Sequence, residues 1–341
     1  MLRIDGSQGE GGGQILRTSL ALSALLQKPI EIFNIRAKRS KPGLAMQHLT
    51  TILAFRKIFS GEVKGAKPGS TRVTFTPSKI KEGEYSIDIG TAGSITLLLH
   101  ALLPAIISHN ITLKIRGGTD VRWSPACDYF SQVFLKNLNH LGVKADIELI
   151  ARGYYPKGNG NVKIETYGVD FIEGYEFKER GKLIGVGGRA HCSNLPEHIV
   201  KREARAAEEA LQYIKAEIDT EVKKELSTGT GITLWADYQK CSMGSNAIGE
   251  IGKSAEEVGR EAAMKLIEEI NSPATLDIHM ADQIIPFAAL ARGRTSFLVR
   301  RLTGHLLTNI ELTEKIMGVK FEKRKQDNHY IISVKGTGWK L

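Results

Sequence analysis

The polar side chains best suited to phosphate chemistry lie among glycines near the start of the chain, in residues 5–17 (DGSQGEGGGQILR). Glycines leave backbone N–H groups unshielded and let the chain pass close to a phosphate. Glu10 could share a hard divalent cation with phosphate oxygens. Because an apolar-periodic segment begins at Ile15, the stretch would deliver a ligand to a helix N-terminus, beside Gln14 and Arg17. A plain glycine-rich turn between a short strand and a helix is the alternative.

Two common nucleotide-binding signatures are absent from this stretch. The chain contains no Gly-x-x-x-x-Gly-Lys-Ser/Thr motif. The dinucleotide fingerprint also fails, because Gly9 and Gly11 are followed by Gln14 where the third glycine belongs. A nucleotide would therefore be held in another way.

A second group of candidate side chains is basic. Residues 36–41 (RAKRSK) place four cations in six residues, just before a predicted helix that carries Gln47 and His48 on its first turns. Cations that precede a helix N-terminus form a concentrated anion site. A run of solvated charges without a binding role is the alternative. The basic run is separated from the glycine-rich stretch by only one short helix hairpin, however, and this proximity favours phosphate binding.

The sharpest catalytic candidate lies near the other end of the chain, in residues 303–309 (TGHLLTN). If Thr303 is the N-cap, His305 lies in the first helical turn. The positive end of a helix disfavours imidazolium, so we expect a neutral imidazole that could attack phosphorus. Residues 279–283 (HMADQ) open the preceding helix. A histidine that only caps the surface beside an apolar stripe of Leu306 and Ile310 is the alternative.

Three further features stay open on the sequence alone. Residues 88–96 (DIGTAGSIT) repeat the glycine-plus-hydroxyl opening before an apolar helix. His100 lies on that helix among leucines, where a histidine is more often a core residue than a ligand. Residues 153–160 (GYYPKGNG) form either a plain hairpin loop or a substrate-facing lip with stacking tyrosines.

The elements that would position these residues follow one repeated order. An apolar helix opens each of three units, at 12–26, 92–108 and 281–291. A β-rich run follows, at 30–36, 111–116 and 295–301. A second, amphipathic helix comes next, at 44–58, 125–141 and 304–317. Two strands close each unit, at 62–64 with 71–76, at 144–150 with 161–165, and at 320–325 with 329–335.

The spacing of the units predicts an inserted domain. Gly12 and Gly93 are 81 residues apart, whereas Gly93 and Ala281 are 188 apart, which leaves a surplus of roughly 100 residues. We expect an α/β (α+β) fold with a large domain made of 1–180 and 276–341 and a small α/β domain at 181–275. The small domain should contain a strand at 183–190, a helix at 196–213, a hairpin of 216–226 with 231–238, and a last helix at 255–270.

Composition favours a soluble, cytoplasmic protein with a polyanionic partner. Lys and Arg number 47 against 37 Asp and Glu, a formal net charge of +10. Three scattered cysteines argue against a zinc site and a disulfide framework. No apolar run reaches the ~18 residues of a membrane span, and no signal peptide is expected. The sequence gives no oligomeric state.

Taken together, these motifs resemble the RNA 3′-terminal phosphate cyclase family. The resemblance runs from end to end of the chain. It rests on 6–14 (GSQGEGGGQ), 36–44 (RAKRSKPGL) with Gln47-His48, 90–94 (GTAGS), 117–120 (GGTD), 153–156 (GYYP), 281–283 (ADQ) and 305–309 (HLLTN). The family's architecture, three α/β units with an inserted smaller domain, agrees with the repeat described above. Enolpyruvyl transferases share a related unit, but their substrate-binding motifs are not found here.

The resemblance implies a reaction in which an RNA 3′-phosphate and ATP give a 2′,3′-cyclic phosphate, AMP and pyrophosphate. His305 matches the nucleophile that becomes a covalent adenylate. Glu10 matches the carboxylate that binds Mg²⁺ or Mn²⁺. The residues expected to bind RNA or nucleotide phosphates are Arg17, Arg36, Arg39 and Gln47. Those expected to contact the nucleotide are His279, Met280, Ala281, Asp282, Gln283 and, where some relatives carry glutamine, His100.

Two other functions compete with this one. A non-catalytic member of the same superfamily would bind RNA during ribosome assembly without adenylylation, but such members lack the histidine that His305 matches. A transferase acting on ATP or a phosphometabolite could be built on the same repeat. RNA affinity that falls steeply with salt would separate the cyclase from that transferase.

Overall fold

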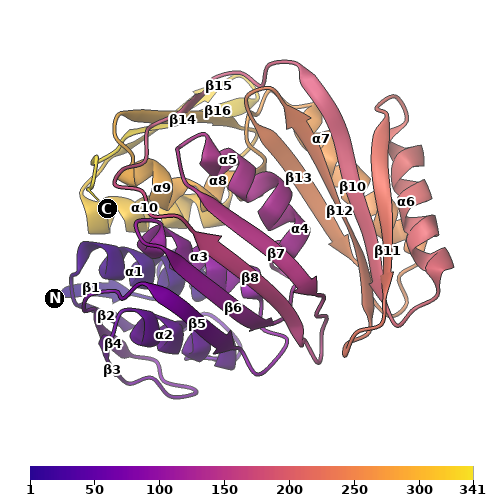
Figure 1. The fold of residues 1–341 in the computed structure, drawn as a ribbon. Helices are drawn as coiled ribbons and strands as arrows, with labels where there is room; N and C mark the ends of the chain where they lie inside the picture. Colours follow the sequence, from indigo (N-terminus) through magenta and orange to yellow (C-terminus); the bar gives the residue numbers. More distant parts are fainter. Residues whose placement is uncertain (341) are drawn as a thin grey trace.

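The computed structural model describes residues 1–340, which form a mixed α/β structure with four four-stranded sheets (Figure 1). The first sheet has the order β1-β2-β4-β3. Its strands are β1 (Leu2–Asp5), β2 (Ile30–Phe33), β3 (Glu62–Lys64) and β4 (Val73–Thr76). β1 and β2 run parallel and are joined through α1 (Gly13–Leu26), and α2 (Met46–Ile58) follows β2. The glycine-rich stretch is therefore the connection from β1 into α1.

The second sheet has the order β5-β6-β8-β7. Its strands are β5 (Gly83–Asp88), β6 (Ile111–Gly117), β7 (Ala145–Ala151) and β8 (Gly160–Thr166), of which the sequence did not predict β5. The helix α3 (Ile95–Ile106) connects β5 to β6. The helix expected at 125–141 is instead divided into α4 (Cys127–Tyr129), a π-helical segment η1 (Phe130–Leu135) and α5 (Lys136–Asn139).

The third sheet has the order β15-β16-β14-β9. Its strands are β9 (Glu176–Phe177), β14 (Arg294–Val299), β15 (Phe321–Gln326) and β16 (His329–Lys335), and α10 (Gly304–Met317) follows β14. The single helix predicted at 281–291 is wrong, because α8 (Ile278–Gln283) and α9 (Ile285–Leu290) take its place. Asp277 caps α8 early, its carboxylate accepting from the N–H groups of His279 and Met280.

The fourth sheet has the order β11-β10-β12-β13 and lies beside the rest of the molecule (Figure 1). Its elements are β10 (Leu183–Ser193), α6 (Glu197–Leu211), β11 (Ala216–Lys223), β12 (Gly229–Tyr238), β13 (Ser242–Ile248) and α7 (Ala255–Ile270). The predicted hairpin of 216–226 with 231–238 is wrong. β11 pairs in parallel with β10, because α6 supplies the crossover that parallel strands need, and β12 pairs with β10 and β13 instead.

The apolar core has two parts. The larger cluster includes buried side chains of α1, α3, α9 and α10, such as Leu20, Leu99, Phe287 and Ile310. A smaller cluster draws its buried residues from 186–266 alone. The division into domains at 180 and 275 stays a prediction. Within residues 1–340, no helix combines the length and apolar character needed to span a bilayer.

Candidate active site

His305 lies where the sequence predicted, in the first turn of α10. The hydroxyl of Thr303 accepts a hydrogen bond from the N–H of Leu306 at 3.1 Å and caps the helix. Leu306 is fully buried and anchors this turn in the core. The side chain of His305 is 52% exposed, so its ring is accessible to a ligand.

Gln14, in the first turn of α1, clamps His305 from the other end of the sequence. Its amide N–H₂ donates to the carbonyl oxygen of His305 at 3.0 Å, and its Oε1 lies 2.6 Å from His305 Nδ1. The carbonyl accepts only from the NH₂ end of the amide, so Oε1 must face the ring and Nδ1 must carry a proton. A neutral His305 in this arrangement has its lone pair on Nε2. The clamp therefore selects the tautomer whose free nitrogen points away from Gln14.

Glu10 lies on the opposite side of the imidazole. Its Oε2 is 3.1 Å from His305 Nε2. A Cβ added to Gly304 would meet the Glu10 carboxylate, so glycine at the start of α10 lets the two lie this close without a shift of the Glu10 side chain. The Glu10 side chain is 40% exposed and presents a hard oxygen donor at the site. One carboxylate fits Mg²⁺ or Mn²⁺ of the kind held jointly by protein, water and substrate phosphates.

The basic loop lies directly against the glycine-rich stretch. Lys38 Nζ donates to the carbonyl oxygen of Gly9 at 3.0 Å. A Cβ at Gly12 would lie 3.1 Å from the Arg39 guanidinium, and one at Gly13 would collide with the ring of His48. These glycines therefore let the backbone lie close to the Arg39 guanidinium and the His48 ring, and the two predicted phosphate-binding segments are in contact.

Arg36 and Gln47 contact the site less directly. Arg36 adopts a left-handed backbone conformation (φ 55°) and donates to the carbonyl of Gly43 at 2.9 Å, which folds the loop back on itself. Burial, with the charge of Arg39, lowers the pKa of Arg36. The Gln47 Cβ faces Gly93, at the opening of α3.

A hydrogen-bonded bridge connects α1, α10 and α8 behind His305. Thr18 donates to Asn309 Oδ1 at 2.9 Å, and Asn309 Nδ2 donates to the carbonyl of Asp282 at 2.8 Å. Asp282 offers its carbonyl because Pro286, four residues on, has no N–H to donate. The break between α8 and α9 therefore creates the acceptor that holds residues 281–283 near His305.

Buried charges surround this bridge. Burial lowers the pKa of Arg17 to about 10, opposed by Asp282. Burial and the charge of Asp277 raise the pKa of Asp282 to about 8, although Arg17 opposes them. Burial and the charges of Arg17 and Arg36 lower the pKa of His48 to about 3. His48 is therefore neutral at pH 7, and Arg17 is the cation beneath the glycine-rich stretch.

The predicted nucleotide-contacting residues differ in their surroundings. Met280 and Ala281 are fully buried in the core, which leaves their neighbours Asp282 and Gln283 to reach a ligand. Gln283 Oε1 is buried without a hydrogen-bond partner, and so is Nε2 of His100. The ring of His100 packs against those of Phe130 and Phe134, at 5.0 and 4.3 Å. His279 is exposed, and desolvation, opposed by the charge of Asp277, lowers its pKa.

Comparison with known proteins identifies the family. The family model described as RNA 3′-terminal phosphate cyclase matches residues 8–323. The chain belongs to this family. It is 46% identical to a protein named RNA 3′-terminal phosphate cyclase from Pyrobaculum neutrophilum, with 99% of each chain covered. The Pyrococcus furiosus protein of that name is 47% identical, with 94% of this chain and 95% of that protein covered.

Similarity to solved structures is much weaker. The enolpyruvyl transferase NikO from Streptomyces tendae aligns with a TM-score of 0.39 and 10% identity, covering 99% of this chain and 48% of that one. A similarity at this level adds nothing to the family assignment. The family assignment therefore rests on sequence, and the site on its own geometry.

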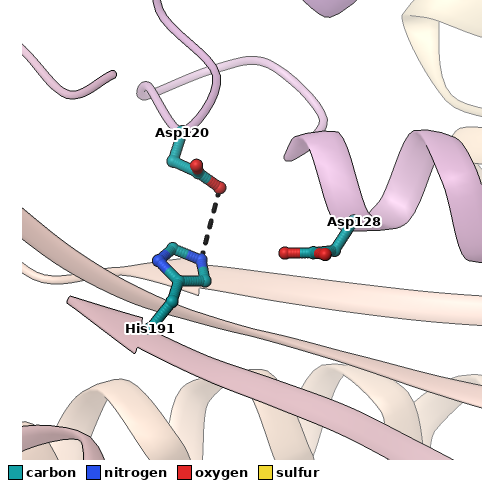
Figure 2. A group of neighbouring side chains, drawn as sticks. All are labelled: Asp120, Asp128 and His191. Atoms are coloured by element: carbon teal, nitrogen blue, oxygen red, sulfur yellow. Dashed lines mark ion pairs between the residues drawn. The ribbon is translucent and has the colours of Figure 1, made fainter. Parts of the chain in front are cut away.

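One charged cluster was missed by the sequence reasoning, because its members come together only in three dimensions. The side chain of Arg152, which is 1% exposed, donates to Asp120 at 3.2 Å, to Asp128 at 2.8 Å and to Glu221 at 2.9 Å. His191 Nε2 lies 3.3 Å from Asp120 Oδ1 (Figure 2). Although Asp120, Asp128 and His191 could enclose a cation, the Arg152 guanidinium already supplies positive charge to the carboxylates. We interpret the cluster as a link between the second and fourth sheets.

Proposed function

We propose that the protein converts an RNA 3′-terminal phosphate to a 2′,3′-cyclic phosphate at the expense of ATP, through adenylylated His305. The observation that carries the proposal is the position of His305, held by Gln14 on one side and facing Glu10 on the other. Family membership and the adjoining basic surface support an RNA substrate with a terminal phosphate.

In the first step, His305 Nε2 attacks the α-phosphorus of ATP. The N–P bond forms as the bond from α-phosphorus to the bridging oxygen breaks, and pyrophosphate leaves. The proton on Nδ1 stays in its hydrogen bond to Gln14. Nε2 attacks through its lone pair, so any proton that it shares with Glu10 in the resting arrangement must first pass to that carboxylate. The adduct ring is then cationic, which makes it a good leaving group.

Cations would hold the phosphates around this step. Arg39 and Lys38 lie against the glycine-rich stretch, where they can neutralise phosphate charge. Mg²⁺ or Mn²⁺ held by Glu10 would neutralise triphosphate charge and assist the departure of pyrophosphate. Binding the cation would also draw the Glu10 carboxylate away from its pairing with His305.

The RNA reacts in the second and third steps. A terminal phosphate oxygen attacks the adenylylated phosphorus and displaces His305, giving an RNA–AMP anhydride. The neighbouring 2′-hydroxyl then attacks the terminal phosphorus and expels AMP. Because this last step is intramolecular, proximity accounts for much of its rate. We assign the terminal phosphate to the surface of Arg36, Arg39 and Gln47, with Arg17 beneath it.

The test is an end-group assay. Purified protein is incubated with ATP, Mg²⁺ and an RNA that ends in a 3′-phosphate, and the product is treated with phosphatase. We expect a phosphatase-resistant end and one AMP per end, both lost in His305→Ala. Phosphatase-sensitive ends with the wild-type protein would contradict the proposal and favour a non-catalytic RNA-binding role.

A further inference from the structure

Two aromatic side chains project from neighbouring loops at one end of the second sheet. Trp123, in the loop after β6, is 93% exposed, and Tyr155, in the loop between β7 and β8, is 77% exposed. Tyr154 points the other way and is 2% exposed. The tyrosine pair singled out in the sequence therefore has one buried and one solvent-facing ring, and the exposed ring has no core function.

Both loops are held firmly in place. The N–H groups of Thr119 and Asp120 donate to the carbonyl of Gly153, which joins the two loops. The Tyr154 hydroxyl lies 2.7 Å from His191 Nδ1 and its N–H donates to the Ser227 hydroxyl at 2.8 Å, which fastens the Tyr155 loop to the fourth sheet. Tyr155 is thus presented from a fixed base rather than from a free loop tip.

The Trp123 loop has a separate attachment. Its neighbour Arg122 forms a salt bridge with Glu250, just after β13. Trp123 itself has a left-handed backbone conformation (φ 60°), which is uncommon for a large side chain and turns its ring to solvent. Backbone strain of this kind at an exposed aromatic side chain favours a binding role over a packing role.

The loops are continuous with the candidate active site. Gly158, at the end of the Tyr155 loop, lies against Thr91 and Ala92, because a Cβ there would come within 2.8 Å of their backbone atoms. Gly93 of the same segment faces Gln47. The next residue, His48, contacts Gly13 of the glycine-rich stretch. A series of close contacts therefore leads from His48 to the Tyr155 loop.

We propose that Tyr155 and Trp123 stack on bases of the RNA that lie 5′ of its last two nucleotides. The inference rests on the proposed function, which places the terminal phosphate near Arg39 and Gln47. Sequence-independent binding of single strands combines aromatic platforms with cations that follow the backbone. Lys157 lies two residues from Tyr155 and has no ion-pair partner within residues 1–340, so it can contact a phosphate there. The loops that carry Trp123 and Tyr155 thus extend the binding site from the terminal phosphate of the RNA to the nucleotides that precede it.

The test compares a 3′-phosphorylated decanucleotide with a 3′-phosphorylated dinucleotide, at one fixed salt concentration. In Tyr155→Ala and in Trp123→Ala we expect Kd for the decanucleotide to rise by about 5- to 150-fold, the range for one lost base–aromatic stack. Kd for the dinucleotide should change less than about 2-fold. Tyr155→Phe, which keeps the aromatic ring, should bind the decanucleotide as the wild type does. Tyr213→Ala is the matched control, because Tyr213 is 96% exposed but lies just after α6.

Two outcomes would overturn the inference: unchanged decanucleotide affinity in both alanine variants, or equal losses for the two RNAs. Incubation with α-labelled ATP and no RNA separates this failure from failure of the proposed function. A wild-type protein that forms no adduct would refute the adenylylation itself. A normal adduct with unchanged decanucleotide binding in the variants would refute only the stacking surface.

Discussion

Replacing Gln14 with leucine tests how the protein prepares His305 for attack. The change removes an amide that is 8% exposed, together with the hydrogen bonds of 3.0 and 2.6 Å to the carbonyl and Nδ1 of His305. Two such bonds contribute about 1 to 3 kcal/mol at ~0.5–1.5 kcal/mol each. Because attack on phosphorus makes the ring cationic, the bond from Nδ1 to Gln14 strengthens in the transition state, and its loss should slow adenylylation by up to about 150-fold.

The assay is single-turnover adenylylation with α-labelled ATP, which isolates the first step from RNA binding. Gln27→Leu is the matched control, because it removes an amide at the other end of α1, where Nε2 donates to the carbonyl of Ala24. That variant should react at the wild-type rate. Gln14→Leu protein that is folded and reacts as fast as wild type would refute the tautomer argument.

Three further predictions follow from individual side chains. Glu10→Ala should weaken the metal dependence of adenylylation while Glu311→Ala, on the exposed side of α10, leaves it unchanged; an unaltered metal titration in Glu10→Ala would place the ligand elsewhere. Arg39→Ala should weaken binding of RNA ending in 3′-phosphate by about 10- to 150-fold, the loss of one charge-assisted hydrogen bond, and binding of 3′-hydroxyl RNA much less; equal losses would assign Arg39 to general backbone contact. Burial raises the pKa of the fully buried Glu203 to about 8, although Thr230 donates to it at 2.8 Å. The native state therefore binds a proton on Glu203 more tightly than the unfolded chain does. The stabilisation that this proton contributes is fully present below the ordinary pKa of a glutamate and is lost as pH rises through about 8. In Glu203→Gln the unfolding free energy should therefore fall less between pH 5 and pH 9 than in the wild type, by at most about 5 kcal/mol. Unfolding free energies from denaturant curves that fall with pH as steeply as those of the wild type would contradict this.

Features set by local sequence were predictable. The start of α10 followed from Thr303, because an N-cap hydroxyl bonds to an N–H only three residues away. The early start of α8 has a similar local signal in Asp277, whereas the predicted start at 281 followed the apolar run after it. The glycine-rich stretch and the basic loop were also recognised from composition alone.

Features set by distant residues were not predictable in the same way. The pairing of β11 with β10 depends on which edge of β10 is free, and hydrophobic alternation carries no information on that choice. The contact of Gln14 with His305 joins residues 291 positions apart, and only the packing of α1 against α10 creates it. The resemblance to a family supplied what local reasoning could not, namely that the two ends of the chain act together.

The central claim is that His305 Nε2 becomes covalently attached to AMP. Wild-type protein and His305→Ala are incubated with ATP and a divalent cation without RNA, and peptides are mapped by mass spectrometry under conditions that preserve acid-labile N–P bonds. We predict an AMP-sized mass increase on the peptide that contains His305, absent from the variant. An adduct on any other residue, or one that persists in His305→Ala, would contradict the account.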